Sequence, residues 1–297
     1  MAVELGSQKE QSPPTSEFIA KLEARWEKGN FICVGLDSDL ARIPITARDR
    51  TPFAMHPTTG AILRFNREII IATADLVCAF KPNIAFYEAQ GVYGMEALQE
   101  TVKFIKWNYP DIPVILDAKR ADIGNTNDGY VRAAFEVLDV DAITVHPYLG
   151  KEALKPFLDR KDKGILVLAR TSNPGAGEFQ DLLIGEEPLY KVVARNVAAS
   201  WNGNGNCGLV VGATYPRELA QIRAVVGNLP ILIPGIGAQG GEVEATVKAG
   251  RDSRGMGMII NSSRGIIFAS NGPDFADAAR YAAQQLRDEI NQHRFAN

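Results

Sequence analysis

Short apolar stretches alternate with amphipathic stretches along almost the whole chain. Eight stretches are nearly continuous apolar runs, which is typical of parallel strands buried on both faces. They are residues 31–37, 78–85, 113–119, 142–147, 164–170, 208–213, 230–235 and 256–261. The intervening stretches have helical spacing, at 60–76, 95–108, 127–138, 151–160, 188–201, 216–226, 241–249 and 274–292, and a first helix is expected at 16–28.

Eight strand–helix units in one chain predict a single (β/α)8 TIM barrel, with a doubly wound open sheet as the alternative. We expect an N-terminal arm and helix at 1–29 and the barrel domain at 30–297. Two connections are unusually long, 38–59 and 171–187. In a barrel both would follow a strand on the ligand-binding face, so the second is either a lid or an ordered surface loop.

Composition narrows the functional class. The 297 residues are 46% hydrophobic and 23% charged, and the net charge of −3 argues against a nucleic-acid-binding surface. Cys33, Cys78 and Cys207 lack CxxC spacing, which favours free thiols in a reducing compartment. The polar N-terminus and the lack of a long apolar run predict a cytoplasmic protein without a signal peptide or membrane segment.

The segment VILDAKRADIGNT, at 114–126, carries the strongest chemical signal. Asp117 and Lys119 alternate along a strand and therefore project from the same face, and Asp122 follows in the turn. Two carboxylates beside one ammonium group would keep the lysine protonated, as a proton donor to a carbanion requires. The alternative is a solvated loop with surface ion pairs.

Other predicted strands also contain polar residues or end in them, although Asp and Lys are disfavoured in buried strands. Together they predict a charged pocket at the carboxyl ends of the strands, where barrel enzymes have their active sites. These residues are Asp37, Lys81, His146, Thr171, Ser172, Ser262, Ser263 and Arg264. The interpretation of His146 stays open between a ligand and a structural residue.

The glycine-rich segment GIGAQGG, at 235–241, is a weak match to a dinucleotide fingerprint because it lies late in the alternation. A better interpretation is an anion site, in which backbone N–H groups, Gln239 and Arg264 bind a phosphate. The alternative is a tight turn without a ligand.

Several other residues are not expected to take part in the chemistry. Glu88, Asp139 and Asp141 lack metal-ligand spacing and are predicted to be solvated charges. The three tryptophans fall on helical patterns and are predicted to pack against the protein; they are Trp26, Trp107 and Trp201.

The pattern D-x-K-x-x-D-I-G-x-T, from Asp117 to Thr126, resembles the signature of the orotidine 5′-phosphate decarboxylase family. Asp37, Lys81 and the segments TSNPG, PGIGAQGG and SSRG resemble further blocks of that family in the same order. The resemblance covers nearly all of residues 30–270 and is closest to the longer bacterial-type subfamily. Ala121 departs from the glycine expected there.

The resemblance implies a catalytic network of alternating charge, Lys81–Asp117–Lys119–Asp122, with Lys119 as the proton donor. It also implies a homodimer with shared active sites, in which Asp122, Ile123 and Thr126 reach the partner's pocket. The implied substrate contacts are Asp37 and Lys81 for the ribose, Ser172 for the pyrimidine, Pro234 for the pocket wall, and Gly237, Gln239, Ser263 and Arg264 for the 5′-phosphate.

The implied reaction is decarboxylation of orotidine 5′-phosphate to uridine 5′-phosphate without a metal or other cofactor. One rival is a magnesium-dependent sugar-phosphate decarboxylase or aldolase, but those relatives typically carry a glutamate where this chain has Lys81. Another rival is a non-catalytic nucleotide-binding barrel. A pure binder of an anionic pyrimidine would not need the two aspartates beside Lys119.

Overall fold

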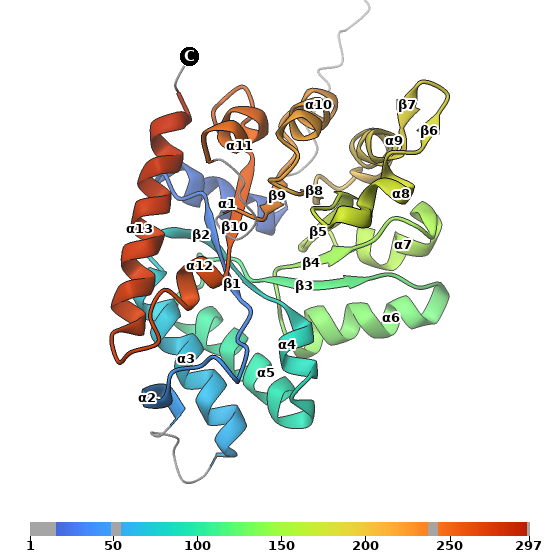
Figure 1. The fold of residues 1–297 in the computed structure, drawn as a ribbon. Helices are drawn as coiled ribbons and strands as arrows, with labels where there is room; N and C mark the ends of the chain where they lie inside the picture. Colours follow the sequence, from blue (N-terminus) through green and yellow to red (C-terminus); the bar gives the residue numbers. More distant parts are fainter. Residues whose placement is uncertain (1–15, 49–54, 237–242, 296–297) are drawn as a thin grey trace, which may run out of the picture.

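Eight parallel strands form a barrel surrounded by helices in the computed structural model, which describes residues 16–48, 55–236 and 243–295 (Figure 1). Parallel bridges Phe80–Val114 and Asn83–Asp117 join the first and last strands of the hydrogen-bonded order, so the sheet curves round almost to closure. The predicted barrel is confirmed. In barrel order the strands are β2 (Val77–Pro82), β1 (Ile32–Leu36), β10 (Met258–Ser262), β9 (Ile231–Pro234), β8 (Cys207–Val211), β5 (Gly164–Arg170), β4 (Ala142–Val145) and β3 (Ile115–Arg120).

The strands lie within three residues of their predicted ends because each contains a nearly continuous apolar run. Most strand residues are buried, from β1 to β10, since one face packs inside the barrel and the other against helices. Only β3 departs from this pattern: its last four residues are charged or partly exposed. This exception marks the position of the functional site.

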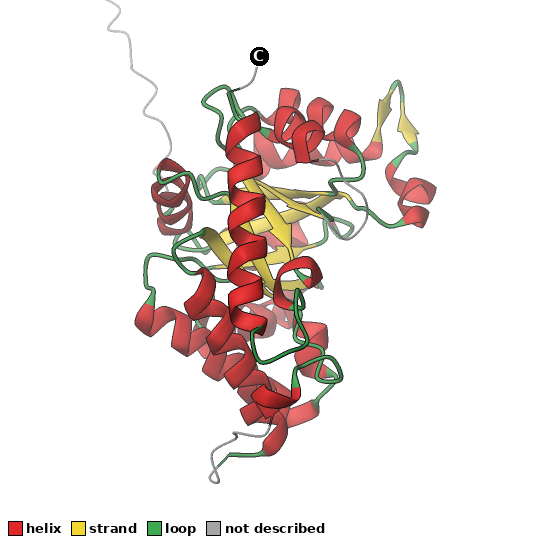
Figure 2. Ribbon diagram, turned by 60° about the vertical axis from the view of Figure 1, so that its left-hand side comes forward, coloured by secondary structure: helices red, strands yellow, loops and turns green. Residues whose placement is uncertain are grey.

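The predicted helices are present and cover the outside of the barrel (Figure 2). They are α1 (Glu17–Glu27), α3 (Pro57–Thr73), α5 (Gly91–Asn108), α6 (Gly124–Arg132), α7 (Gly150–Leu158), α9 (Leu189–Asn196), α10 (Pro216–Val226), α11 (Val243–Gly250) and α13 (Phe275–His293). Single π-helical turns, Ala133–Val137 and Val197–Trp201, extend α6 and α9. Among the described residues, four short helices were not predicted, because one turn is too short to show periodicity: α2 (Ile45–Arg48), α4 (Ile84–Glu88), α8 (Gly177–Gln180) and α12 (Arg264–Ile267).

The long connection after β5 contains local structure of its own. A 3₁₀ turn at Pro174–Ala176 leads into α8, followed by a two-stranded hairpin of β6 (Leu183–Ile184) and β7 (Glu187–Pro188). The hairpin extends from the barrel beside α9 (Figure 1). The connection is thus partly ordered by its own hydrogen bonds.

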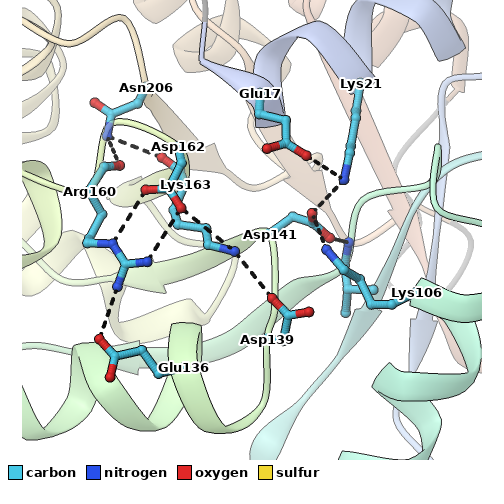
Figure 3. A network of polar contacts seen from close by, with 11 residues as sticks. Glu17, Lys21, Lys106, Glu136, Asp139, Asp141, Arg160, Asp162, Lys163 and Asn206 are labelled. Atoms are coloured by element: carbon cyan, nitrogen blue, oxygen red, sulfur yellow. Dashed lines mark hydrogen bonds and ion pairs between the residues drawn. The ribbon is translucent and has the colours of Figure 1, made fainter.

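At the opposite end of the barrel, Asp141 corrects one expectation. It is buried, not solvated, and its carboxylate accepts hydrogen bonds from Lys21 at 2.9 Å, Lys106 at 2.8 Å and the backbone N–H of Val114 at 2.8 Å (Figure 3). The sequence did not reveal this because the three donors come from α1, α5 and the approach to β3. Asp141 therefore ties α1 to the base of the barrel.

Two of the three tryptophans pack against the protein as predicted. Trp26 and Trp201 are buried, but Trp107, at the end of α5, is 88% exposed, so the prediction that it packs against the protein is wrong. All three cysteines are buried and free. Among the described residues, no helix combines the length and the apolar character needed to cross a membrane.

Candidate active site

Two lysines and two aspartates lie in a row across the carboxyl ends of β1, β2 and β3. Asp117 lies between the lysines: its Oδ2 is 3.2 Å from Lys81 Nζ and its Oδ1 is 2.7 Å from Lys119 Nζ. Lys81 is also 3.8 Å from Oδ1 of Asp37. The side chains of Lys81 and Asp117 are nearly buried, whereas that of Lys119 is 51% exposed at the mouth of the barrel.

Burial and charge act in opposite directions in this row. Desolvation alone would raise the pKa of Asp117, but Lys81, Lys119 and two hydrogen bonds outweigh it and hold that pKa well below its usual range. For Lys81, desolvation would lower the pKa, but the charges of Asp117 and Asp37 outweigh desolvation and raise that pKa above its usual value. Lys81 and Asp117 therefore stay ionised at neutral pH, as a buried pair of fixed charges.

The backbone at Lys119 is strained. Its φ is 47°, in the left-handed region that is unfavourable for a residue with a Cβ, and the pairing of β3 with β4 shifts register between Leu116 and Arg120. The Oγ1 of Thr144, on β4, accepts the backbone N–H groups of both Ala118 and Lys119 at 3.0 Å. These bonds support the irregular backbone that presents the lysine.

Two adjoining cavities open beside this row. One, of about 490 Å³, is lined by Lys119, Thr144, Leu168, Val210 and Leu232 among others. The other, of about 160 Å³, is lined by Asp37, Ser263 and Arg264 among others. Both cavities share the residues Lys81, Asp117, Ser172 and Pro234. The site can thus receive a ligand with one end near Lys119 and an anionic group near Arg264.

Ser172 is positioned by the loop that follows β5. Oε1 of Gln180, on α8, accepts hydrogen bonds from the backbone N–H of Thr171 at 2.8 Å and from the guanidinium of the buried Arg170 at 3.2 Å. Nε2 of Gln180 donates a hydrogen bond to Thr171 Oγ1 at 2.8 Å. Gly212 allows a close approach, because a Cβ there would lie 2.8 Å from the Cβ of Ser172. The loop is therefore held against the barrel mouth.

The structure does not bring every predicted site residue to this cavity. Asp122, Ile123 and Thr126 line neither cavity of their own chain, and Ile123 is 62% exposed. Asp122 accepts the N–H of Ile123 at 2.7 Å, and the described residues contain no ion pair between it and Lys119. The expectation that two carboxylates flank Lys119 within one chain is therefore wrong, and the Asp122 carboxylate is instead used in a local hydrogen bond.

Gly237 and Gln239 lie outside the described residues. Of the glycine-rich segment, Gly235 and Ile236 are described, and both line the smaller cavity. Ser263, which follows β10, and Arg264, which begins α12, also line the smaller cavity. The arginine of the predicted anion site therefore lies at this cavity.

Two polar residues of the site were missed from the sequence, Thr144 and Asn261. Both are inward-facing polar residues near the end of an apolar strand, and that position was the available signal. Asn261 lines the smaller cavity between Pro234 and Ser263. Within the described part of the chain, no three His, Cys, Asp or Glu side chains are grouped as metal ligands would be.

Comparison with known proteins agrees with this geometry. Residues 31–279 match the model of the family described as orotidine 5′-phosphate decarboxylase / HUMPS. The chain is 50% identical over 278 residues to an orotidine 5′-phosphate decarboxylase of Ralstonia nicotianae and 51% identical to one of Azoarcus sp., covering 93% of this chain and 99% of each relative. Leishmania donovani OMP decarboxylase superposes with a TM-score of 0.80 at 39% identity, covering 95% of this chain and 100% of that one.

Proposed function

The chain belongs to the orotidine 5′-phosphate decarboxylase / HUMPS family, whose curated relatives here are carboxy-lyases, and we propose that it converts orotidine 5′-phosphate to uridine 5′-phosphate. The observation that supports this most strongly is the row Lys81–Asp117–Lys119 at the mouth of a cavity that also contains Arg264. In this proposal residues 30–297 form the catalytic domain and no metal or other cofactor takes part.

The row supplies what loss of CO2 requires. When the bond between C6 and its carboxylate breaks, the electron pair stays on C6, where the pyrimidine ring delocalises it poorly. The Lys119 ammonium group stabilises that charge and then donates its proton to C6, giving the product. Asp117, hydrogen-bonded to Lys119 at 2.7 Å, orients the proton donor from the side of the departing carboxylate.

The remaining contacts hold the substrate in place. Arg264 and Ser263 bind the 5′-phosphate, with Gly237 and Gln239 of the glycine-rich segment completing that site. Asp37 and Lys81 bind the ribose, Ser172 binds the pyrimidine, and Pro234 forms part of the wall. Phosphate binding far from C6 supplies binding energy that orients the ring for reaction.

We further propose a homodimer in which each active site is shared. Asp122, Ile123 and Thr126 lie at the carboxyl end of the barrel but outside their own cavity, and the apolar side chain of Ile123 is exposed. In a dimer these residues would contact the substrate bound by the partner subunit.

The free, buried cysteines support a reducing, cytoplasmic location for this enzyme.

The nearest rival within the same family description is a metal-dependent enzyme acting on a sugar phosphate. Incubation with orotidine 5′-phosphate and EDTA, followed by ultraviolet absorbance, separates the two. We expect full turnover in EDTA. Loss of activity in EDTA with recovery on adding magnesium would favour the rival, and no turnover under either condition would refute the proposed reaction.

A further inference from the structure

Asn261 lines the smaller cavity and has an unpartnered acceptor. The residue is 6% exposed, and its Oδ1 is buried without a hydrogen-bond partner. Its Nδ2 donates to Ser263 Oγ at 3.4 Å, which leaves Oδ1 as the atom available to a ligand. A buried amide oxygen without a partner is costly, so a ligand that supplies a donor is a physical explanation for keeping it.

The neighbouring strands offer this oxygen no donor. A Cβ on Gly35, on β1, would lie 3.2 Å from Oδ1 and 1.8 Å from Ser263 Oγ, so glycine leaves this space to the two polar side chains. On the other side, the register partner of Asn261 on β9 is Pro234, which has no N–H. Oδ1 therefore lies without a donor on a residue that lines the cavity.

Its place in the cavity identifies the ligand group. Arg264 and Ser263 continue from the same strand toward the proposed phosphate position, while Asp37 and Lys81 line the cavity at the proposed ribose position. The phosphate and the carboxylate of orotidine 5′-phosphate carry no donor at neutral pH. Apart from the pyrimidine N–H, which lies at the Ser172 end, the hydroxyls of the ribose are the donors that remain.

We propose that Asn261 is a further substrate-binding residue, whose Oδ1 accepts a hydrogen bond from a ribose hydroxyl of the bound nucleotide. This inference rests on the proposed function and adds a specificity determinant to it. It predicts that Asn261 helps the site to distinguish the ribonucleotide from the analogue that lacks the bound hydroxyl.

The test is a cycle of binding measurements. Dissociation constants for uridine 5′-phosphate and its 2′-deoxy and 3′-deoxy analogues are measured by calorimetry with the wild-type protein and with Asn261→Ala. We expect loss of the contacted hydroxyl to weaken wild-type binding about tenfold and to weaken binding to Asn261→Ala by about twofold or less. If removing either hydroxyl weakened binding by the same factor in wild type and in Asn261→Ala, the assignment would be overturned.

Two further variants separate binding from structure. Ser263→Ala removes the partner of Nδ2 and a proposed phosphate contact, but not the acceptor. It should therefore weaken binding of all three nucleotides alike, and the loss of affinity caused by removing the contacted hydroxyl should stay as in wild type. Asn261→Leu replaces a buried amide whose oxygen has no partner with an apolar side chain, so the Tm of its ligand-free form should equal or exceed that of wild type. The variant should also repeat the loss of discrimination. A Tm several degrees lower with discrimination retained would indicate a structural role. Turnover of orotidine 5′-phosphate by wild type tests the proposed function separately.

Discussion

The hydroxyl of Thr144 donates a hydrogen bond to Oδ1 of Asp117 at 2.9 Å, across the boundary between β4 and β3. The same Asp117 oxygen is 2.7 Å from Lys119 Nζ, and the same threonine oxygen accepts the Lys119 backbone N–H. One threonine thus positions both the carboxylate and the strained backbone of the proposed proton donor.

Thr144→Val keeps the shape of the side chain and removes these hydrogen bonds. We expect kcat to fall roughly 10- to 100-fold, because bonds to a charged group are worth about 1.5–3 kcal/mol. The affinity for uridine 5′-phosphate should change less. Steady-state kinetics check this, with Thr144→Ser as the matched variant that should keep most activity; equal losses in both variants would contradict the role of the hydroxyl.

Lys119→Ala removes the proposed proton donor. We expect kcat to fall by at least about 10³-fold, because both charge stabilisation and proton transfer are lost, while the protein stays folded. Circular dichroism and product formation provide the measurements. Lys103→Ala, at an exposed lysine paired with Glu100 on α5, is the matched control and should remain active. Full turnover by Lys119→Ala would refute the assignment.

Arg264→Ala removes the cation at the proposed phosphate position. We expect binding of uridine 5′-phosphate to weaken roughly 10- to 100-fold, whereas binding of uridine, which lacks the phosphate, should hardly change. Calorimetry measures both. Arg132→Ala, an exposed arginine on α6, serves as the control. An equal effect on both ligands would remove Arg264 from the phosphate site.

Asp141→Asn tests the ionic anchor at the base of the barrel. Burial would raise the pKa of Asp141, but Lys106, Lys21 and the bond from Val114 lower it overall. A lowered folded-state pKa contributes stability above the unfolded value of about 4, and that stability is lost as the pH falls through the folded value. We therefore expect wild type to lose stability below about pH 4 more steeply than Asp141→Asn.

At neutral pH the same variant should be less stable by about 3 kcal/mol, because two lysines lose their buried partner. Thermal unfolding between pH 2.5 and 7 measures both effects. Glu17→Gln removes an exposed carboxylate that also pairs with Lys21, and it should change little. An Asp141→Asn protein with the wild-type acid profile would show that other carboxylates govern acid unfolding.

Mixed dimers test the shared site. Lys119→Ala and Asp122→Ala proteins, each inactive alone, should recover activity when their subunits are exchanged. Random exchange places one intact site in about half of the dimers, so we expect about a quarter of wild-type activity. If isolated heterodimers stay inactive, Asp122 does not act in the partner's site.

Much of the site was predictable because strand ends in a barrel converge. Asp37, Lys81 and Asp117 follow apolar runs, and that pattern predicted that they would meet. The partners of buried charges were not predictable, because they come from distant segments. Asp141, with donors from α1 and α5, was mistaken for a solvated charge for this reason.

The sequence by itself determined the eight strand–helix units, their order and the charged residues at the strand ends, because these follow from local periodicity. Tertiary structure alone decided that Lys119 has a left-handed backbone supported by Thr144, that Asp122 lies outside its own cavity, and that Asn261, which lines the smaller cavity, has an unpartnered oxygen. Each depends on register and close packing between strands, which side-chain patterns along one strand do not encode.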